Sequence, residues 1–239
     1  MSDPRLIVAL DVPSLEEAKA LVETLGDEVS FYKVGMELFY RVGVSVIDYL
    51  HHEGKEIFLD LKLHDIPNTV AEGLCSLMEA RVSLLNVHAQ GGYAMMKTAG
   101  ERVRTKAAQQ GVPAPRLIAV TLLTSLSEKE WQRLGHTESI AQQVIRLAKL
   151  AKEAGLDGVV TSPWETADIR QVCGEEFLII TPGIRPTGSE MADQHRIATP
   201  AAALQNGATH IVVGRPIRGA KDPRAAAQAI IQEMKGILP

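Results

Sequence analysis

Residues 56–69 read EIFLDLKLHDIPNT, and this stretch contains the unit that recurs along the whole chain. Its first half is an apolar run of strand length, and Ile66-Pro67-Asn68-Thr69 carries proline where a helix begins. Asp60 and Lys62 are two residues apart, so their side chains share one face of a strand, while leucines occupy the other face. The stretch predicts a strand followed by a helix, with charged side chains inside the sheet or at its mouth.

Short β-branched runs of the same kind recur from one end of the chain to the other. They are Leu6–Asp11, Phe31–Gly35, Glu56–Lys62, Leu84–Ala89, Arg116–Leu122, Gly158–Ser162, Phe177–Gly183 and His210–Pro216. Several are apolar at consecutive positions, as in Ile211-Val212-Val213, which is typical of parallel strands buried on both faces. Each run is therefore interpreted as a parallel strand.

Helix signals lie between these runs. Ser14-Leu15-Glu16-Glu17 predicts a capping box, and Gly26 is placed to end that helix. Ser127 precedes another helical stretch, and Thr199-Pro200 and Asp222-Pro223 each pair a cap residue with proline at the first helical position. The intervening segments are therefore expected to be helices.

Eight alternating strand-helix units in 239 residues predict a (β/α)8 TIM barrel that forms one domain over residues 1–239. A doubly wound sheet is the alternative. Such a sheet usually has a glycine-rich turn after its first strand, but here the turn is Asp11-Val12-Pro13-Ser14, and no G-x-G-x-x-G occurs. No linker rich in proline, glycine or serine divides the chain. The barrel is the favoured fold.

Composition narrows the classes of function. Apolar residues make up 46% of the chain and charged residues 23%, and the net charge is −4 without a basic run, so no nucleic-acid partner is expected. The longest uncharged stretch, from Ile197 to Gly214, contains polar residues, so no membrane partner is expected. No signal peptide is recognised, and Cys75 and Cys173 form no metal or redox motif. A cytoplasmic protein is expected.

Polar side chains stand at the carboxyl ends of the predicted strands, where active sites of this fold lie. They are Asp11, Lys33, Asp60, Lys62, His88, Thr121, Thr124, Ser162 and Arg215, with Gly214 beside Arg215 and with Arg185 and Gln194 in the loop after the seventh strand. Charged groups inside apolar strands are costly unless they are paired. Their gathering at one end of the barrel predicts a site.

The densest group is Asp60, Lys62 and Asp65. A lysine between carboxylates stays protonated, and carboxylates beside a lysine stay ionised, so the group would form a proton donor framed by fixed negative charge. An ion-pair network that serves stability alone is the alternative, at a large desolvation cost. Alternatives also stay open elsewhere. Lys33 could point outward, His88 could fill the core, and Asn68 and Thr69 could be simple helix caps.

A second group predicts an anion site. Gly214-Arg215-Pro216-Ile217 follows the last strand, Arg185 lies in the preceding loop, and the loops after the seventh and eighth strands of such barrels often bind phosphate. The segment Gly183–Glu190 is punctuated by glycine and could close over that phosphate as a lid. An ordinary surface loop is the alternative.

The string D-x-K-x-x-D-I-P-N-T over Asp60–Thr69, with Asp11 and Lys33 before it and T-P-G-I-R and V-G-R-P after it, resembles the orotidine 5′-phosphate decarboxylases of the bacterial type. The resemblance runs through all eight units. It implies a carboxy-lyase of pyrimidine biosynthesis that converts orotidine 5′-phosphate (OMP) to uridine 5′-phosphate (UMP) and carbon dioxide. It also implies that the enzyme uses neither a metal nor another cofactor.

The resemblance also implies roles for single residues. Lys62 would protonate C6 of the pyrimidine, Asp60 would lie against the departing carboxylate, and Lys33 and Asp65 would form with them a set of four alternating charges. Asp11 and Lys33 would contact the ribose, Thr124 the pyrimidine edge, and Arg185, Gln194, Gly214 and Arg215 the phosphate. The full set implied for substrate binding is Asp11, Lys33, Asp60, Leu61, Lys62, Leu63, His64, Asp65, Ile66, Pro67, Asn68, Thr69, Thr124, Arg185, Gln194, Gly214 and Arg215.

The family resemblance implies a homodimer in which Asp65, Ile66 and Thr69 complete the site of the partner subunit. Two other functions are weighed against it. Keto-gulonate phosphate decarboxylases share D-x-K-x-x-D but use Mg²⁺ and carry an acidic residue where Lys33 stands, and a lysine there repels a divalent cation. A non-catalytic barrel that senses nucleotides or phosphates would have no need to keep Asp60, Lys62 and Asp65 together.

Overall fold

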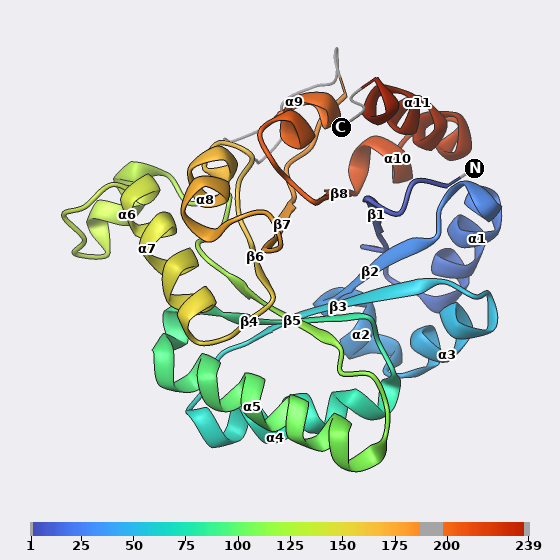
Figure 1. The fold of residues 1–239 in the computed structure, drawn as a ribbon. Coiled ribbons are helices and arrows are strands. Elements are labelled where there is room, and N and C mark those ends of the chain that lie inside the picture. Colours follow the sequence, from blue (N-terminus) through green and yellow to red (C-terminus); the bar gives the residue numbers. More distant parts are fainter. Residues whose placement is uncertain (1, 187–197, 237–239) are drawn as a thin grey trace.

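The computed structural model describes residues 2–186 and 198–236, and within them the strands close into a barrel (Figure 1). The strands are β1 Leu6–Ala9, β2 Phe31–Gly35, β3 Glu56–Leu63, β4 Leu84–His88, β5 Arg116–Val120, β6 Gly158–Val160, β7 Leu178–Thr181 and β8 His210–Val213. Each strand pairs in parallel with the next along the chain, and β8 closes the ring by pairing with β1. The predicted (β/α)8 barrel is confirmed.

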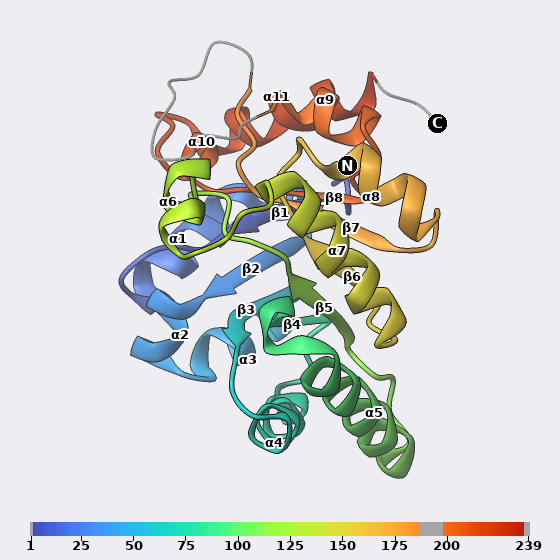
Figure 2. The same cartoon turned by 90° about the vertical axis from the view of Figure 1, so that its left-hand side faces the viewer.

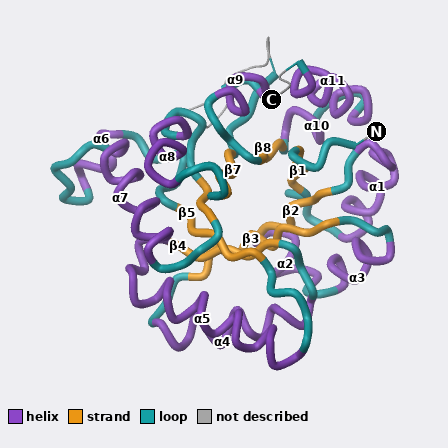
Figure 3. The backbone as a smooth tube through the Cα atoms, in the orientation of Figure 1, coloured by secondary structure: helices purple, strands orange, loops and turns teal. Residues whose placement is uncertain are grey.

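The helices surround the strands on the outside, as Figure 3 shows by colour. They are α1 Leu15–Leu25, α2 Met36–Val42, α3 Ser45–His52, α4 Pro67–Leu77, α5 Gly92–Gln110, α6 Glu128–Arg133, α7 Ile140–Glu153, α8 Thr166–Cys173, α9 Pro200–Gln205, α10 Arg215–Arg218 and α11 Pro223–Lys235. Short 3-10 turns occupy Gly26–Glu28, Met78–Ala80 and Ala89–Gly91. Figures 1 and 2 both show α4 and α5 packed side by side. Within the described residues, no helix is both long enough and apolar enough to cross a bilayer.

Local side chains begin and end these helices where the sequence predicts. The Ser14 hydroxyl accepts a hydrogen bond from the backbone N–H of Glu17 at 3.1 Å, and Gly26, with φ of 53°, ends α1. Ser127 forms a full capping box with Glu130 at the start of α6. At Ser14 the second bond of the box differs from the prediction, because the Glu17 carboxylate accepts from the Ser14 hydroxyl at 3.4 Å.

Two apolar layers hold the barrel together. The larger layer packs the outward faces of the strands against the helices. The smaller layer fills the barrel interior and consists of Ile7, Ala9, Phe31, Phe58, Leu84, Ile118, Val120, Val160, Ile180 and Val212. Because side chains alternate along a strand, the inward positions that follow this layer lie at the carboxyl end of the barrel. On β2, β3 and β4 those positions hold Lys33, Asp60 and Asn86.

Candidate active site

Four charged side chains form one chain of contacts at the carboxyl ends of β1, β2 and β3. The ammonium nitrogen of Lys33 donates to Oδ1 of Asp11 at 2.9 Å and lies 3.4 Å from Oδ2 of Asp60. The ammonium nitrogen of Lys62 donates to Oδ1 of Asp60 at 2.7 Å. The charges therefore alternate in the order Asp11, Lys33, Asp60, Lys62, and we call these four residues the charge array. Lys33 points inward and is largely buried.

The electrostatics of the array keep Lys33 and Asp60 charged. Burial alone would raise the pKa of Asp60, but Lys33, Lys62 and the hydrogen bonds to the carboxylate hold that pKa below its ordinary value. Burial would lower the pKa of Lys33, but Asp60 and Asp11 hold it above its ordinary value. A buried carboxylate beside a buried ammonium thus remains ionised around neutral pH.

Gly35 leaves room for the array because it has no side chain. A Cβ added to Gly35 would lie 2.9 Å from the Lys33 ammonium and 3.2 Å from Oδ1 of Asp11. Any larger residue at this position would push the ammonium away from its partner. Gly35 is a site residue that the sequence reasoning did not identify, although it ends the strand that carries Lys33.

The backbone of β3 is irregular where it carries the array. Leu59 pairs with Leu85 on β4 and Leu63 pairs with Val87, with a shift of register between them. Lys62 lies inside the shift and has φ of 53°, a left-handed conformation that is uncommon for a residue with a side chain. Asp60 and Lys62 do meet, as the two-residue spacing predicts, but on an irregular strand.

Asn86 of β4 is the second residue that the sequence reasoning missed. It is fully buried, its amide nitrogen donates to Oδ1 of Asp60 at 2.6 Å, and its amide oxygen accepts from the backbone N–H of Lys62 at 2.8 Å. The available signal was an asparagine within the apolar run Leu84–Val87. A buried polar side chain in such a strand requires partners, and here the partners are residues of the array.

His88 lies at the end of the same strand, near Lys62. Its ring is 5.4 Å from the ring of His64 between centroids, and its Nδ1 atom is buried without a hydrogen-bond partner among the described residues. Burial lowers the pKa of His88, and the nearby His64 and Lys62 lower it further. The imidazole is therefore neutral at pH 7. In the part of the chain that the structure describes, His88 forms no hydrogen bond with a carboxylate of the array.

An arginine-rich cavity of about 190 Å³ adjoins the array. Its walls come from the loops after β7 and β8 and from the ends of β1 and β2, and its lining residues are Ala9, Asp11, Lys33, Pro182, Gly183, Arg185, Val212, Gly214, Arg215 and Arg218. Arg185 is buried, and one of its guanidinium nitrogens donates to the carbonyl of Ile184 at 2.9 Å. The predicted Arg185, Gly214 and Arg215 therefore come together, joined by Arg218, which the sequence reasoning missed.

The segment after Lys62 does not line this cavity. Leu61 and Leu63 pack outward against the strand-helix layer. His64, Asp65, Ile66, Asn68 and Thr69 are exposed, Pro67 is half-buried, and Asp65 accepts a hydrogen bond from the neighbouring Ile66 N–H at 2.6 Å. No contact joins Asp65 to the array within the described part of one chain.

Other predicted residues lie apart from the array. Thr124 is half-buried in the loop after β5 and does not line the cavity. Thr121 is buried and donates to the carbonyl of Val160 at 3.1 Å, and the Ser162 hydroxyl accepts from the Trp164 N–H at 3.2 Å. Gln194 lies outside the described residues, as do residues 187–190 of the predicted lid.

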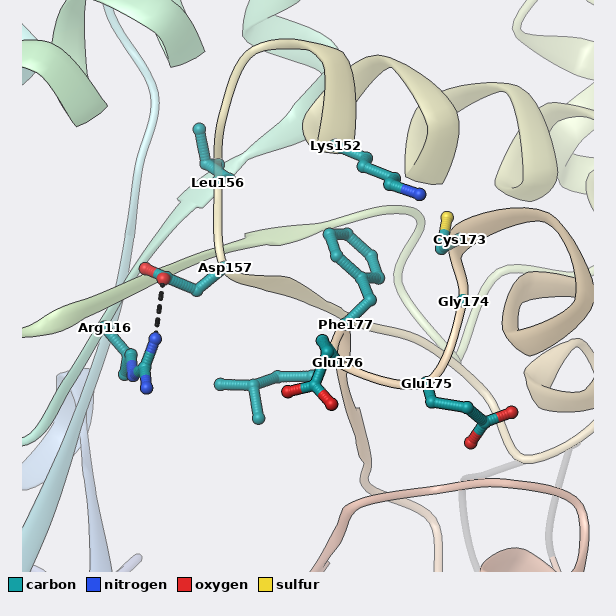
Figure 4. Close-up of a pocket in the computed structure, with 10 residues that line it drawn as sticks. Arg116, Lys152, Leu156, Asp157, Cys173, Gly174, Glu175, Glu176 and Phe177 are labelled. Carbon is teal, nitrogen blue, oxygen red and sulfur yellow. Dashed lines mark hydrogen bonds and ion pairs between the residues drawn. The ribbon is translucent and has the colours of Figure 1, made fainter.

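A larger pocket, of about 640 Å³, lies at the opposite end of the barrel (Figure 4). Its wall includes the first residues of β5 and β7, Arg116 and Leu178, together with Asp157 just before β6. Arg116 is paired with Asp157 at 3.1 Å, and Glu175 and Glu176, which also line the pocket, are exposed. Active sites of this fold lie at the carboxyl ends of the strands, so the smaller cavity is the candidate.

Comparisons with known proteins show which family the chain belongs to. Residues 4–230 match the family model described as "Orotidine 5'-phosphate decarboxylase / HUMPS family". The chain is similar to orotidine 5′-phosphate decarboxylase of Moorella thermoacetica, with 49% identity over 97% of this chain and 92% of the relative. It is 50% identical to the Carboxydothermus hydrogenoformans enzyme of the same name, over 98% of this chain and 97% of that one. The crystal structure of orotidine 5′-phosphate decarboxylase from Lactobacillus acidophilus superimposes with a TM-score of 0.84 at 43% identity, covering 97% of this chain and 99% of that one.

Proposed function

Because the chain belongs to the orotidine 5′-phosphate decarboxylase / HUMPS family, we propose that it is a carboxy-lyase that converts OMP to UMP and carbon dioxide in pyrimidine biosynthesis. The observation that carries this proposal is the charge array beside an arginine-lined cavity. The array supplies an ammonium group held by a buried carboxylate. The cavity supplies positive charge for the phosphate at the other end of the nucleotide.

The decarboxylation of OMP requires a proton donor but no electron-accepting cofactor. When the C6–carboxylate bond breaks, carbon dioxide leaves and the bonding electron pair stays on C6 in the plane of the ring. A nearby ammonium stabilises that charge and then donates its proton to C6. Lys62, whose Nζ is 2.7 Å from Asp60, is the proposed donor, and the neutral amine that remains regains a proton from solvent.

Asp60 is proposed to lie against the carboxylate that leaves. Its pKa is held low by Lys33 and Lys62, so it brings fixed negative charge to the reaction centre. Repulsion between this charge and the substrate carboxylate is relieved when carbon dioxide departs, which is one form of ground-state destabilisation. Asp11 and Lys33, which are paired with each other, are proposed to bind the ribose hydroxyls.

The phosphate is proposed to bind in the cavity through Arg185, Gly214 and Arg215, with Gln194 as a further contact. Guanidinium groups bind phosphate through charge-assisted hydrogen bonds. Binding energy at this remote group can be used to hold the pyrimidine against the array, which raises the rate of the chemical step and not only the affinity. Thr124 is proposed to contact the pyrimidine edge.

The metal-free form of the reaction is supported by Lys33. This ammonium lies 2.9 Å from Asp11 and 3.4 Å from Asp60, so it neutralises the carboxylates that a divalent cation would otherwise bind. A Mg²⁺-dependent decarboxylase of a keto-sugar phosphate, the alternative on the same barrel, needs an acidic residue in this place. We therefore propose that no cofactor takes part.

The enzyme is proposed to act as a homodimer in which Asp65, Ile66 and Thr69 complete the partner's site. Asp65 has no contact with the array of its own chain among the described residues, and the Ile66 side chain is 66% exposed. Burial of Ile66 against a second copy of the chain would bring the neighbouring Asp65 to the partner's site. The free, buried thiols of Cys75 and Cys173 favour a reducing compartment, and we assign the enzyme to the cytoplasm.

The test is the change in ultraviolet absorbance of OMP with purified protein in excess EDTA. Wild type is compared with Lys62→Ala and with Lys129→Ala, a control that removes an exposed lysine from α6. Wild type and the control should convert OMP at equal rates, and Lys62→Ala should not. Absence of conversion by folded wild type contradicts the proposed function, and activity that returns only with Mg²⁺ contradicts the metal-free form.

A further inference from the structure

We propose that Asn86 is a positioning residue for the reaction, because its side-chain amide replaces a missing backbone partner and thereby holds Asp60 and Lys62 in place. The inference rests on the proposed function and goes beyond it. Asn86 need not touch the substrate to do this. It acts through the two residues that are proposed to meet the leaving carboxylate and the C6 atom.

The register of β3 against β4 shows what is missing. Between the paired residues Leu59 and Leu63, β3 has three residues, while between their partners Leu85 and Val87, β4 has only Asn86. The backbone of β4 therefore cannot offer a regular partner to each residue of the bulge. The backbone N–H of Lys62 would be left unpaired inside the barrel wall.

The Asn86 side chain supplies that partner. A primary amide has the same acceptor and donor groups as a peptide unit. Here its oxygen accepts the Lys62 N–H at 2.8 Å and its nitrogen donates to Oδ1 of Asp60 at 2.6 Å. One side chain thus binds both the backbone of the proposed proton donor and the carboxylate beside it.

This arrangement holds Lys62 in a conformation that it would not adopt unaided. Lys62 has φ of 53°, which crowds its Cβ against the backbone. Residues persist in such conformations only where surrounding contacts determine them. The bond from Asn86 is such a contact, and Asn86 has no exposed surface from which water could compete.

The same amide orients the Asp60 carboxylate. Oδ1 accepts from both Asn86 and the Lys62 ammonium, the latter at 2.7 Å, while Oδ2 faces Lys33 at 3.4 Å. With the donor from Asn86 removed, the carboxylate could rotate and the Lys62 ammonium would follow it. Misplacement of a reacting group by about 1 Å can cost about 100-fold in rate.

The experiment compares wild type with Asn86→Ala, Asn86→Asp and the control Thr161→Val. Thr161 follows β6, is also fully buried and polar, and its hydroxyl has no hydrogen-bond partner among the described residues. For Asn86→Ala, kcat on OMP should fall by about 100-fold with KM little changed, because the phosphate cavity is untouched. The acidic limb of its rate profile should move to higher pH, because Asp60 loses a donor that favours its ionised form.

Asn86→Asp gives a second, independent readout. The new carboxyl group keeps the shape of the amide but can donate to Asp60 only when it is protonated. Its activity should therefore rise as pH falls, opposite to the profile of wild type. Thr161→Val should match wild type in both rate and pH profile. An Asn86→Ala enzyme with kcat close to wild type, or an Asn86→Asp profile parallel to that of wild type, would overturn the inference.

Hydrogen exchange at the Lys62 amide separates this inference from the proposed function. The Lys62 amide should exchange faster in Asn86→Ala than in wild type, and at the wild-type rate in Thr161→Val. This expectation holds whatever substrate the enzyme uses. If the exchange rate in Asn86→Ala equals that of wild type, the hydrogen bond from Asn86 does not hold Lys62 in place. If folded wild type does not act on OMP, the proposed function fails, while the exchange result still decides whether Asn86 holds the bulge.

Discussion

The ammonium of Lys33 stands between two carboxylates, 2.9 Å from Asp11 and 3.4 Å from Asp60. The three side chains come from the ends of neighbouring parallel strands or from just beyond them, so the pairing of β1 with β2 and of β2 with β3 brings them together. Asp60 in turn lies 2.7 Å from Lys62. The central members of the array, Lys33 and Asp60, are therefore each paired with two groups of opposite charge. Removing Lys33 or Asp60 leaves both of its partners without that compensating charge.

Asp60→Asn tests the fixed negative charge. The amide keeps the size of the side chain but leaves the ammonium groups of Lys33 and Lys62 facing each other without the anion between them. We expect kcat on OMP to fall by about 10²–10³-fold, the usual cost of losing one preorganised electrostatic contact. Asp27→Asn, at an exposed aspartate, is the matched control and should retain full activity. Steady-state rates that differ little between the two variants would contradict the role of Asp60.

Arg215→Ala tests the phosphate cavity. A hydrogen bond to a charged group contributes about 1.5–3 kcal/mol, so the apparent affinity for OMP should fall by roughly 10–100-fold. Turnover of orotidine, which lacks the phosphate, should be low in wild type and little changed by the substitution. Arg133→Ala, which removes an exposed arginine from α6, serves as control. Equal turnover of orotidine and OMP by wild type would rule out a catalytic use of phosphate binding.

A mixture of Lys62→Ala and Asp65→Ala tests the shared site. Each variant alone should be nearly inactive. If Asp65 serves the partner's site, a hybrid dimer has one site with both residues intact, and random exchange of subunits should restore about one quarter of wild-type activity. Sedimentation or light scattering should give the mass of a dimer for both variants. If the mixture is no more active than the separate variants, then Lys62 and Asp65 of one chain serve the same site, or no dimer forms.

His210 makes stability depend on pH. Burial lowers its pKa to about 4 from an ordinary value of 6.5, and its ring packs edge-on against Phe31 with centroids 6.0 Å apart. The folded state therefore favours the neutral ring. This contribution to stability is complete above pH 6.5 and is lost as pH falls from 6.5 towards 4, by at most about 3 kcal/mol.

Urea unfolding at several pH values measures this effect. His210→Gln should reduce the slope of unfolding free energy against pH between 6.5 and 4, because no imidazole remains there to be protonated. His52→Gln, at a side chain that is 85% exposed, should leave the slope unchanged. The same slope in His210→Gln as in wild type would mean that other groups cause the loss of stability.

Arg170 of α8 is predicted to stabilise the fold without affecting the reaction. Its guanidinium donates to the carbonyl of Gly207 at 2.8 Å and to that of Phe177 at 2.9 Å, as well as to those of Gly174 and Glu175. Arg170→Ala should lower the free energy of unfolding by about 3 kcal/mol, because the part-buried hydrogen bonds to the carbonyls of Phe177 and Gly207 lose their charged donor. Its kcat on OMP should match wild type.

Arg102→Ala is the contrast, because Arg102 forms an exposed ion pair with Glu72. Such pairs contribute about 0–1 kcal/mol, so denaturant unfolding should barely detect its loss. Equal effects of the two substitutions would show that the carbonyl contacts of Arg170 carry no special weight.

The repeat of apolar runs was sufficient to predict the barrel, because parallel strands covered on both sides must be apolar at successive positions. Active sites of this fold lie at the carboxyl ends of the strands, and this pointed to Lys33, Asp60 and Lys62. In the structure Asp60 contacts both lysines. Gly35 and Asn86 were not predicted. The importance of each depends on a neighbour from another part of the chain, and neither belongs to a motif that spacing alone reveals.

The sequence by itself determined the order of strands and helices, the end of the barrel where charge gathers, and the residue types available there. Those properties follow from local periodicity and from the direction of parallel strands. Only the tertiary structure decided the register shift opposite Asn86, the left-handed backbone of Lys62 and the meeting of Arg218 with Arg185 and Arg215 in one cavity. These depend on how one strand or loop lies against another, and such contacts between distant segments leave no periodic signal in the chain.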